Sequence, residues 1–142
     1  SEPDPPEPRG CTDGGELKDG VCSNGQPVYI PDGKAIPYLR IEKQERTSWP
    51  EGTERGIKAS LNLQIVVLPD GKVTEIQPMF LRVTLPGKEE ERMNPSEDKY
   101  GFGRAAYEAV SKRRYGEPTL NGKPVAVYSS VCTEFDAATA TE

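Results

Sequence analysis

The sequence contains no histidine in its 142 residues. This absence excludes Ser-His-Asp and Cys-His catalysis, zinc sites with a histidine ligand, and histidine-based pH switches. Catalysis would have to depend on carboxylates, lysines or tyrosines, and no candidate nucleophile has an identifiable base beside it. We therefore expect a protein that is not an enzyme and that has no cofactor and no metal site.

Apolar residues are also scarce, at 34% of the chain, whereas an ordinary globular chain has about 45–50%. The longest aliphatic run, residues 65–68, is far shorter than the roughly 20 apolar residues that span a bilayer. The length predicts one domain with a tail. We expect an acidic, Pro- and Gly-rich tail over residues 1–26, a folded domain over 27–136, and a frayed C-terminus over 137–142.

The charge is negative overall, at −5, which argues against nucleic-acid binding because such binding neutralises phosphates with Lys and Arg. Residues 1–20 hold six carboxylates against two cations, whereas residues 99–124 hold six cations against two carboxylates. The cluster Lys112, Arg113 and Arg114 is expected in the last turn of a helix, where cations complement the helix dipole. The competing interpretation is a basic contact for an anionic cell-wall glycan or an acidic partner segment.

The chain has only three cysteines. Cys11 and Cys22 flank a segment rich in Gly and Asp that has too few apolar groups to order itself by burial. A disulfide between them would contribute about 3 kcal/mol and would place the protein in an oxidising compartment. Two unpaired thiols, or a bond from Cys132 to either N-terminal cysteine, are the alternatives.

Strand patterns dominate the middle and the end of the sequence. Residues 58–68 place apolar side chains on one face at every second position. Asp70 and Gly71 then predict a tight hairpin of type I′, in which both central residues have positive φ. A return strand is expected over residues 73–83, and a last strand over 124–135.

One helix is predicted after an exposed loop at residues 86–99. Its apolar residues have the spacing of a single helical stripe, and Gly116 is expected to cap its C-terminus. We therefore expect an α+β fold of two layers, in which one principal helix packs on a small antiparallel sheet made of the hairpin and the C-terminal strand. The residues of the stripe are Phe102, Ala105, Ala106, Ala109 and Val110.

Short motifs follow one another along the chain in a characteristic order. They are Trp49-Pro50, Arg55-Gly56-Ile57, Pro69-Asp70-Gly71-Lys72-Val73, Arg104-Ala105-Ala106-Tyr107-Glu108-Ala109-Val110, Arg114-Tyr115, Pro118, Asn121-Gly122-Lys123-Pro124-Val125-Ala126-Val127 and Phe135. This ordered set resembles the C-terminal domain of TonB-type energy transducers over residues 27–136. Where that family usually opens its helix with Leu-Asp, this chain has Phe102-Gly103, so we expect Asp98 to supply the capping carboxylate. Trp49 is expected to be a structural anchor.

The resemblance implies a periplasmic interaction module, tethered to the inner membrane by an upstream segment. Its last strand would be a sheet edge that pairs with the TonB box, a short peptide motif of outer-membrane transporters, and transmits energy to them. The alternative is an envelope adaptor or structural protein of the same fold that binds another envelope protein or peptidoglycan. The strand edge would alternatively be covered by the tail or by a second copy in a homodimer. The implied partner-binding residues are Val125, Ala126, Val127, Tyr128, Ser129, Ser130, Val131, Cys132 and Thr133.

Overall fold

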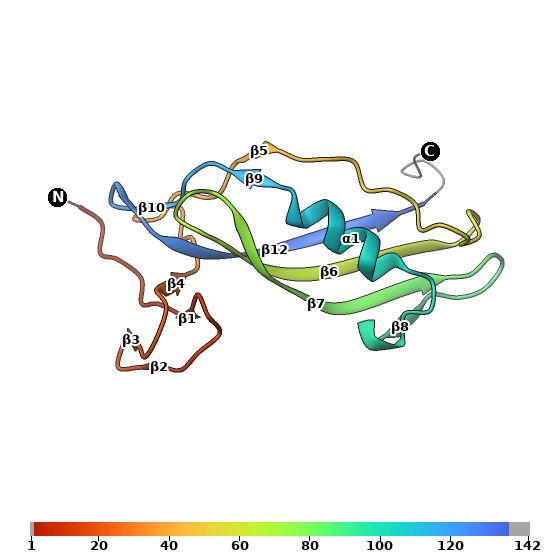
Figure 1. Cartoon of the computed structure of the whole chain (residues 1–142), viewed down its shortest axis with the longest axis horizontal. Helices are drawn as coiled ribbons and strands as arrows, with labels where there is room; N and C mark the ends of the chain where they lie inside the picture. The colour runs from red at the N-terminus through yellow and green to blue at the C-terminus, as the bar shows by residue number, and fades with distance from the viewer. Residues whose placement is uncertain (1, 137–142) are drawn as a thin grey trace. The chain divides into compact units, whose positions relative to one another are not determined.

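The computed structural model describes residues 2–136 (Figure 1). The residues expected to form a frayed C-terminus, 137–142, lie outside this range. The described elements are twelve strands, one α-helix and one 3₁₀ turn. In chain order they are β1 (Gly10–Cys11), β2 (Leu17–Lys18), β3 (Val21–Cys22), β4 (Pro27–Tyr29), β5 (Ile41–Lys43), β6 (Lys58–Val67), β7 (Val73–Thr84), β8 (Glu91–Met93), η1 (Pro95–Glu97), α1 (Phe102–Ser111), β9 (Arg114–Tyr115), β10 (Thr119–Leu120), β11 (Lys123–Pro124) and β12 (Ala126–Phe135).

Six of the strands form one sheet in the order β1-β4-β12-β6-β7-β8. The pair β4–β12 is parallel, whereas β1–β4 and β7–β8 are antiparallel. The prediction of two layers with a small antiparallel sheet and one principal helix is therefore wrong, since the described residues are 40% strand and 10% helix and form a six-stranded mixed sheet. The additional strands β1, β4 and β8 have two or three residues each, too few to show an alternating pattern.

Contacts divide the described chain into two compact units. The first unit comprises residues 2–43, 65–75 and 113–129, and the second comprises 44–64, 76–112 and 130–136. The long strands β6, β7 and β12 supply residues to both units.

The first unit packs around Val28, Val66 and Ala126, which are buried. Ala126 of β12 pairs with Val28 of β4, and Val28 pairs in turn with Gly10 of β1. Regular structure therefore begins at Gly10, within the segment that the sequence assigned to a tail. The predicted disulfide between Cys11 and Cys22 is confirmed, and it closes the segment that holds the β2–β3 hairpin.

The hairpin turn between β6 and β7 differs from the predicted type. The carbonyl of Leu68 accepts a hydrogen bond from the Gly71 amide at 2.8 Å, and the Leu68 amide donates to the carbonyl of Lys72 at 2.8 Å. Of the two residues Asp70 and Gly71, only Gly71 has positive φ, at 85°. This is the three-residue loop in which a turn is followed by a left-handed glycine. The type I′ pattern occurs instead at Asn121 and Gly122, with φ values of 48° and 85°.

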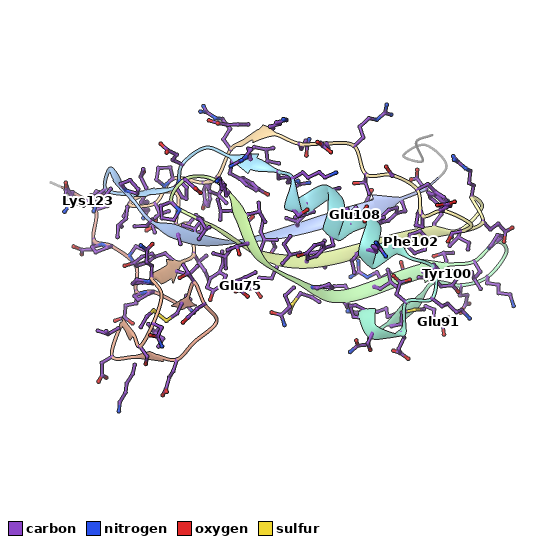
Figure 2. The ribbon with its side chains drawn as sticks, in the orientation of Figure 1. Glu75, Glu91, Tyr100, Phe102, Glu108 and Lys123 are labelled. Atoms are coloured by element: carbon purple, nitrogen blue, oxygen red, sulfur yellow. A yellow bond between two sulfur atoms is a disulfide. The ribbon has the colours of Figure 1, made fainter. Side chains whose placement is uncertain are left out.

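The second unit packs one face of α1 against the strands (Figure 1). Phe102, Ala106 and Val110 are its buried helical residues, which confirms the predicted stripe at every three to four positions. Phe102 lies at the start of the helix (Figure 2), with its ring centre 4.8 Å from that of Phe135 and 5.7 Å from that of Trp49. Trp49 also donates its indole N–H to the carbonyl of Thr53 at 2.8 Å, so its expected role as a structural anchor is confirmed.

The chain leaves the helix earlier than the sequence predicted. The helix ends at Ser111, Lys112 is the C-cap residue, and the last turn contains no basic residue. The expected placement of the three cations in that turn, and of Gly116 as the cap, is therefore wrong. The reason is tertiary: β9 begins at Arg114 and pairs with β5, so the backbone becomes extended immediately after the helix. Similarly, residues 86–99 are not only an exposed loop, because they contain β8 and η1.

Asp98 caps the helix as predicted. One carboxylate oxygen accepts the amides of Tyr100 at 2.9 Å and Gly101 at 3.2 Å, and the other accepts the amide of Gly103 at 2.7 Å. These contacts satisfy amides that have no partner inside the helix. They also place a negative charge at the positive end of the helix dipole.

Replacing Asp98 by alanine is expected to lower the free energy of unfolding by about 1–2 kcal/mol, because three amides lose their acceptor. Asp98→Asn keeps one acceptor oxygen and is expected to lose about half as much. Urea denaturation followed by far-UV circular dichroism would measure both values. Equal stability of the alanine variant and the unmodified chain would contradict the capping role.

Candidate functional site

The predicted partner-binding strand is present as β12, but only part of it lies at an edge. β12 stands between β4 and β6 in the sheet, and its pairs with β4 are confined to Ala126 and Val127. Val125 precedes the strand and donates its amide to the carbonyl of Pro118 at 3.0 Å. The expectation that the whole segment 125–133 is an edge is therefore wrong for its first three residues.

Beyond Val127, β12 extends past the end of β4, because β4 stops at Tyr29 and the two strands run parallel. No other strand of residues 2–136 pairs with that side of β12. The segment 128–133 keeps the predicted alternation: Val131 and Thr133 are 5% and 7% exposed, whereas Ser130 and Cys132 are exposed. Cys132 is a free thiol, so its alternative pairing with an N-terminal cysteine is not found.

The open side of β12 lacks the features that usually protect a sheet edge. Segment 128–133 has no proline and no charged residue. In contrast, β8 covers only residues 81–83 of β7, and the uncovered part of β7 contains Pro78, which cannot donate a backbone hydrogen bond. Proline, short strands and exposed charges all discourage pairing at an edge. Of these two edges, β12 is therefore the better suited to accept another strand.

The predicted basic contact does not form a single site. Lys112 makes an ion pair with Glu45 at 3.5 Å, in which both side chains are at least half exposed. Arg113 donates to the hydroxyl of Tyr115 at 3.1 Å, and Arg114 belongs to β9. Each cation thus has a different neighbour, and an exposed ion pair of this kind contributes about 0–1 kcal/mol.

Titratable groups give little sign of chemistry in the described part of the chain. The amides of Ile36 and Lys34 each donate to the Asp32 carboxylate at 2.9 Å, and these bonds hold the pKa of Asp32 below its usual value. They shape an exposed turn.

Among residues 2–136 no three His, Cys, Asp or Glu side chains are grouped as metal ligands. The helix α1, with ten residues, is too short to cross a membrane, and no longer apolar helix occurs in this range.

Sequence reasoning missed one cluster on the outer strands. Phe80 and Arg82 of β7 meet Arg92 of β8 there, and β8 was interpreted as loop. These side chains meet only because β7 and β8 pair in one particular register. No pattern in the sequence indicates that register.

No protein-family model matches the sequence, and no curated protein matches it. The TonB resemblance therefore rests on the ordered motifs of the sequence alone.

Proposed function

We propose that this chain is a non-enzymatic interaction module that accepts an extended peptide as an additional strand alongside β12. The observation that carries the proposal is the pairing of β12: only the first two of its ten residues pair with β4. The following segment, 128–133, carries neither proline nor charge. Strand addition at such an edge obtains affinity from main-chain hydrogen bonds.

Side chains at alternate positions would give the specificity. Ser130 and Cys132 point to the exposed face, where they meet alternate side chains of a paired peptide. Val131 and Thr133 point into the core and hold the strand in place. Because the hydrogen bonds of a paired strand act together, the edge transmits a pulling force along the peptide.

The partner follows from the resemblance to TonB C-terminal domains. It is the TonB box of an outer-membrane transporter, met in the periplasm, with an upstream segment of the protein anchored in the inner membrane. The confirmed disulfide between Cys11 and Cys22 is consistent with an oxidising compartment.

Titration of the ¹⁵N-labelled chain with TonB-box peptides tests the proposal. We expect the largest backbone amide shifts at residues 128–133. A control peptide with the same side chains, N-methylated at alternate residues, cannot donate the strand hydrogen bonds and is expected to bind at least about tenfold more weakly.

Two results would count against strand pairing at β12. One is equal affinity for the N-methylated and the unmodified peptide. The other is a set of shifts confined to another surface, such as the uncovered part of β7. Binding at residues 128–133 by a peptide from another envelope protein, but by no TonB box, would support the adaptor instead of the transducer.

A further inference from the structure

Three exposed cations from separate parts of the sequence lie in one row across the first unit. Lys43 of β5 is directly opposite Arg114 of β9 in the antiparallel pair of these two strands (Figure 1). Lys72 forms a separate antiparallel bridge with the same residue, Arg114. Directly opposite residues in an antiparallel pair have Cα atoms about 4.5–5.5 Å apart. Arg114 therefore has a second cation close to it on each side.

The three side chains are turned to solvent on one side of these strands. Tyr115 points into the core and is 5% exposed, so the alternation of β9 turns its neighbour Arg114 outward. Residues directly opposite each other share one face, which places Lys43 and Lys72 beside Arg114, and all three are exposed. The Tyr115 amide donates to the carbonyl of Gly71 at 3.0 Å, so the backbone holds this row together.

The segments that meet at this row have an excess of positive charge. They carry five arginine and lysine side chains against three carboxylates, which leaves two positive charges over. The segments are residues 40–43, 70–75 and 113–115.

The contacts of the individual side chains leave this excess on the row itself. The carboxylate of Glu42 pairs with Arg40 at 3.6 Å, outside the row. The Asp70 carboxylate lies 3.9 Å from the ammonium group of Lys72, and both side chains are more than half exposed, so this ion pair is weak. The other two cations of the row form no ion pair within residues 2–136.

This arrangement is suited to an anion with two charges and several oxygens. Like charges directly opposite each other destabilise a strand pair, and a bound anion would offset that repulsion. A carboxylate carries one charge and two oxygens, both of which Arg114 alone can bind with its planar fork. A phosphate monoester carries a charge of about −1.5 to −2 at pH 7 and three terminal oxygens. It can therefore accept hydrogen bonds from the arginine and from a lysine on each side.

We propose that Lys43, Lys72 and Arg114 bind a phosphate monoester group. Arg114 donates to two of its oxygens, and the two lysines contact the group from either side. The group belongs to a soluble phosphate ester or to a lipid headgroup, since both present the same oxygens. The site uses none of the open edge of β12, so it does not depend on the proposed function.

Titration of the ¹⁵N-labelled full chain with glycerol 3-phosphate tests the proposal. We expect the Nε–H signal of Arg114 and the backbone amides of Lys43 and Lys72 to move together. Vesicles of phosphatidylcholine with and without phosphatidic acid present the same group on a membrane, and co-sedimentation measures binding to them. Binding of glycerol 3-phosphate without binding to the vesicles would identify a soluble ester, and tighter binding to the phosphatidic acid vesicles would identify a headgroup.

The charge of the ligand distinguishes this site from general attraction of anions. A phosphate monoester loses its second proton with a pKa of about 6, so its affinity is expected to rise about three- to tenfold between about pH 5 and pH 7.5. The chain has no histidine, the side chain whose ordinary pKa lies in this range, so the rise would report the ligand. Dimethyl phosphate keeps a single charge and is expected to bind at least about fivefold more weakly at neutral pH.

Substitutions in the row test the residues. Arg114→Gln is expected to weaken binding of glycerol 3-phosphate about tenfold or more, and Lys43→Gln about threefold. Each substitution removes a like charge from the row, so we expect both variants to be at least as stable as the unmodified chain. Thermal unfolding would confirm that any loss of binding is not a loss of folding.

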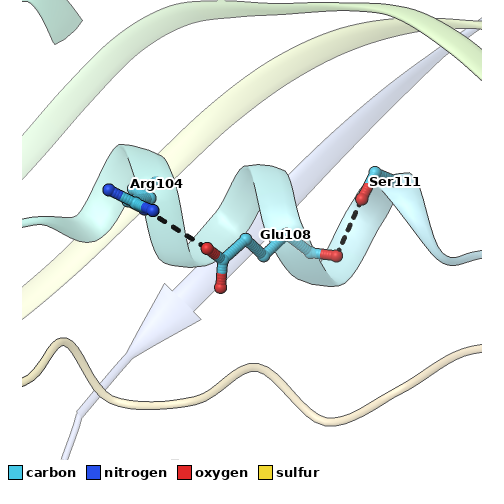
Figure 3. A network of polar contacts seen from close by, with 3 residues as sticks. All are labelled: Arg104, Glu108 and Ser111. Carbon is cyan, nitrogen blue, oxygen red and sulfur yellow. Dashed lines mark hydrogen bonds and ion pairs between the residues drawn. The ribbon is translucent and has the colours of Figure 1, made fainter.

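The matched control is Arg104→Gln, which removes the same charge from an exposed position on α1. Arg104 already has a partner there, because its Nε donates to Glu108 at 3.3 Å (Figure 3), and the carbonyl of Glu108 accepts the hydroxyl of Ser111. We expect this variant to bind glycerol 3-phosphate within about twofold of the unmodified chain, because a distant exposed charge is screened by salt.

Three outcomes would overturn the proposal. The first is equal weakening by Arg114→Gln and Arg104→Gln, which would indicate attraction by net charge alone. The second is binding of neither glycerol 3-phosphate nor the phosphatidic acid vesicles, or binding that leaves the Arg114 signal unmoved. The third is an affinity for glycerol 3-phosphate that does not change with pH or does not exceed the affinity for dimethyl phosphate.

Discussion

Phe102→Ala is expected to lower the free energy of unfolding by about 3–5 kcal/mol, the usual loss for a large aromatic side chain removed from a core. The Phe102 side chain is fully buried, and its ring contacts those of Trp49, Tyr100 and Phe135. The change therefore removes apolar burial and leaves a cavity. It also removes ring contacts worth about 0.5–1.5 kcal/mol each beyond burial.

The control for this variant comes from the same helix. Tyr107 lies five residues further along α1 and is 51% exposed, so Tyr107→Ala is expected to cost less than about 1 kcal/mol. Urea denaturation followed by tryptophan fluorescence suits the comparison, because Trp49 is the single tryptophan and contacts Phe102 directly. Similar losses in the two variants would show that Phe102 is not central to this core.

Gly71→Ala is expected to destabilise the protein by about 2–5 kcal/mol. Gly71 has a φ of 85°, and placing a side chain in that left-handed region costs about 1–2 kcal/mol. A Cβ atom at this position would also collide with the carbonyl oxygen of Tyr115. The Tyr115 backbone cannot easily move away from this Cβ atom, because the Tyr115 amide donates a hydrogen bond to the carbonyl of Gly71 at 3.0 Å. The collision adds about 1–3 kcal/mol of strain.

A variant at Gly122 separates the cost of the positive φ from the cost of the collision. It has the same φ of 85°, but a Cβ atom there would meet nothing within 4 Å. Gly122→Ala is therefore expected to cost only the conformational part, about 1–2 kcal/mol. Thermal and urea unfolding of the two variants would give the difference. If both lost the same stability, the close approach of Gly71 to Tyr115 would not be significant in solution.

Peptide binding at the edge of β12 would depend on main-chain hydrogen bonds, so its affinity is expected to change little as salt concentration rises.

The sequence by itself determined the long elements and the local chemistry. Strands β6, β7 and β12 have ten to twelve residues each, long enough for an alternating pattern to appear, and α1 has a stripe of matching period. The disulfide between Cys11 and Cys22 and the cap by Asp98 were also predictable, because each joins residues close together in the chain.

Only the tertiary structure decided which strands lie side by side. The strands β1, β4 and β8 are too short to carry a period, so their places in the sheet depend on the strands with which they pair. For β4 that partner is β12, which lies far away in the sequence. Which part of β12 is open depends on where β4 ends, and the meeting of Arg82 with Arg92 depends on the register of β7 and β8. These are properties of pairs of segments, whereas hydrophobic period, turn chemistry and capping are properties of a single segment. The sequence therefore indicated which strand of this chain would bind the partner, and the fold decided which residues of that strand form an edge.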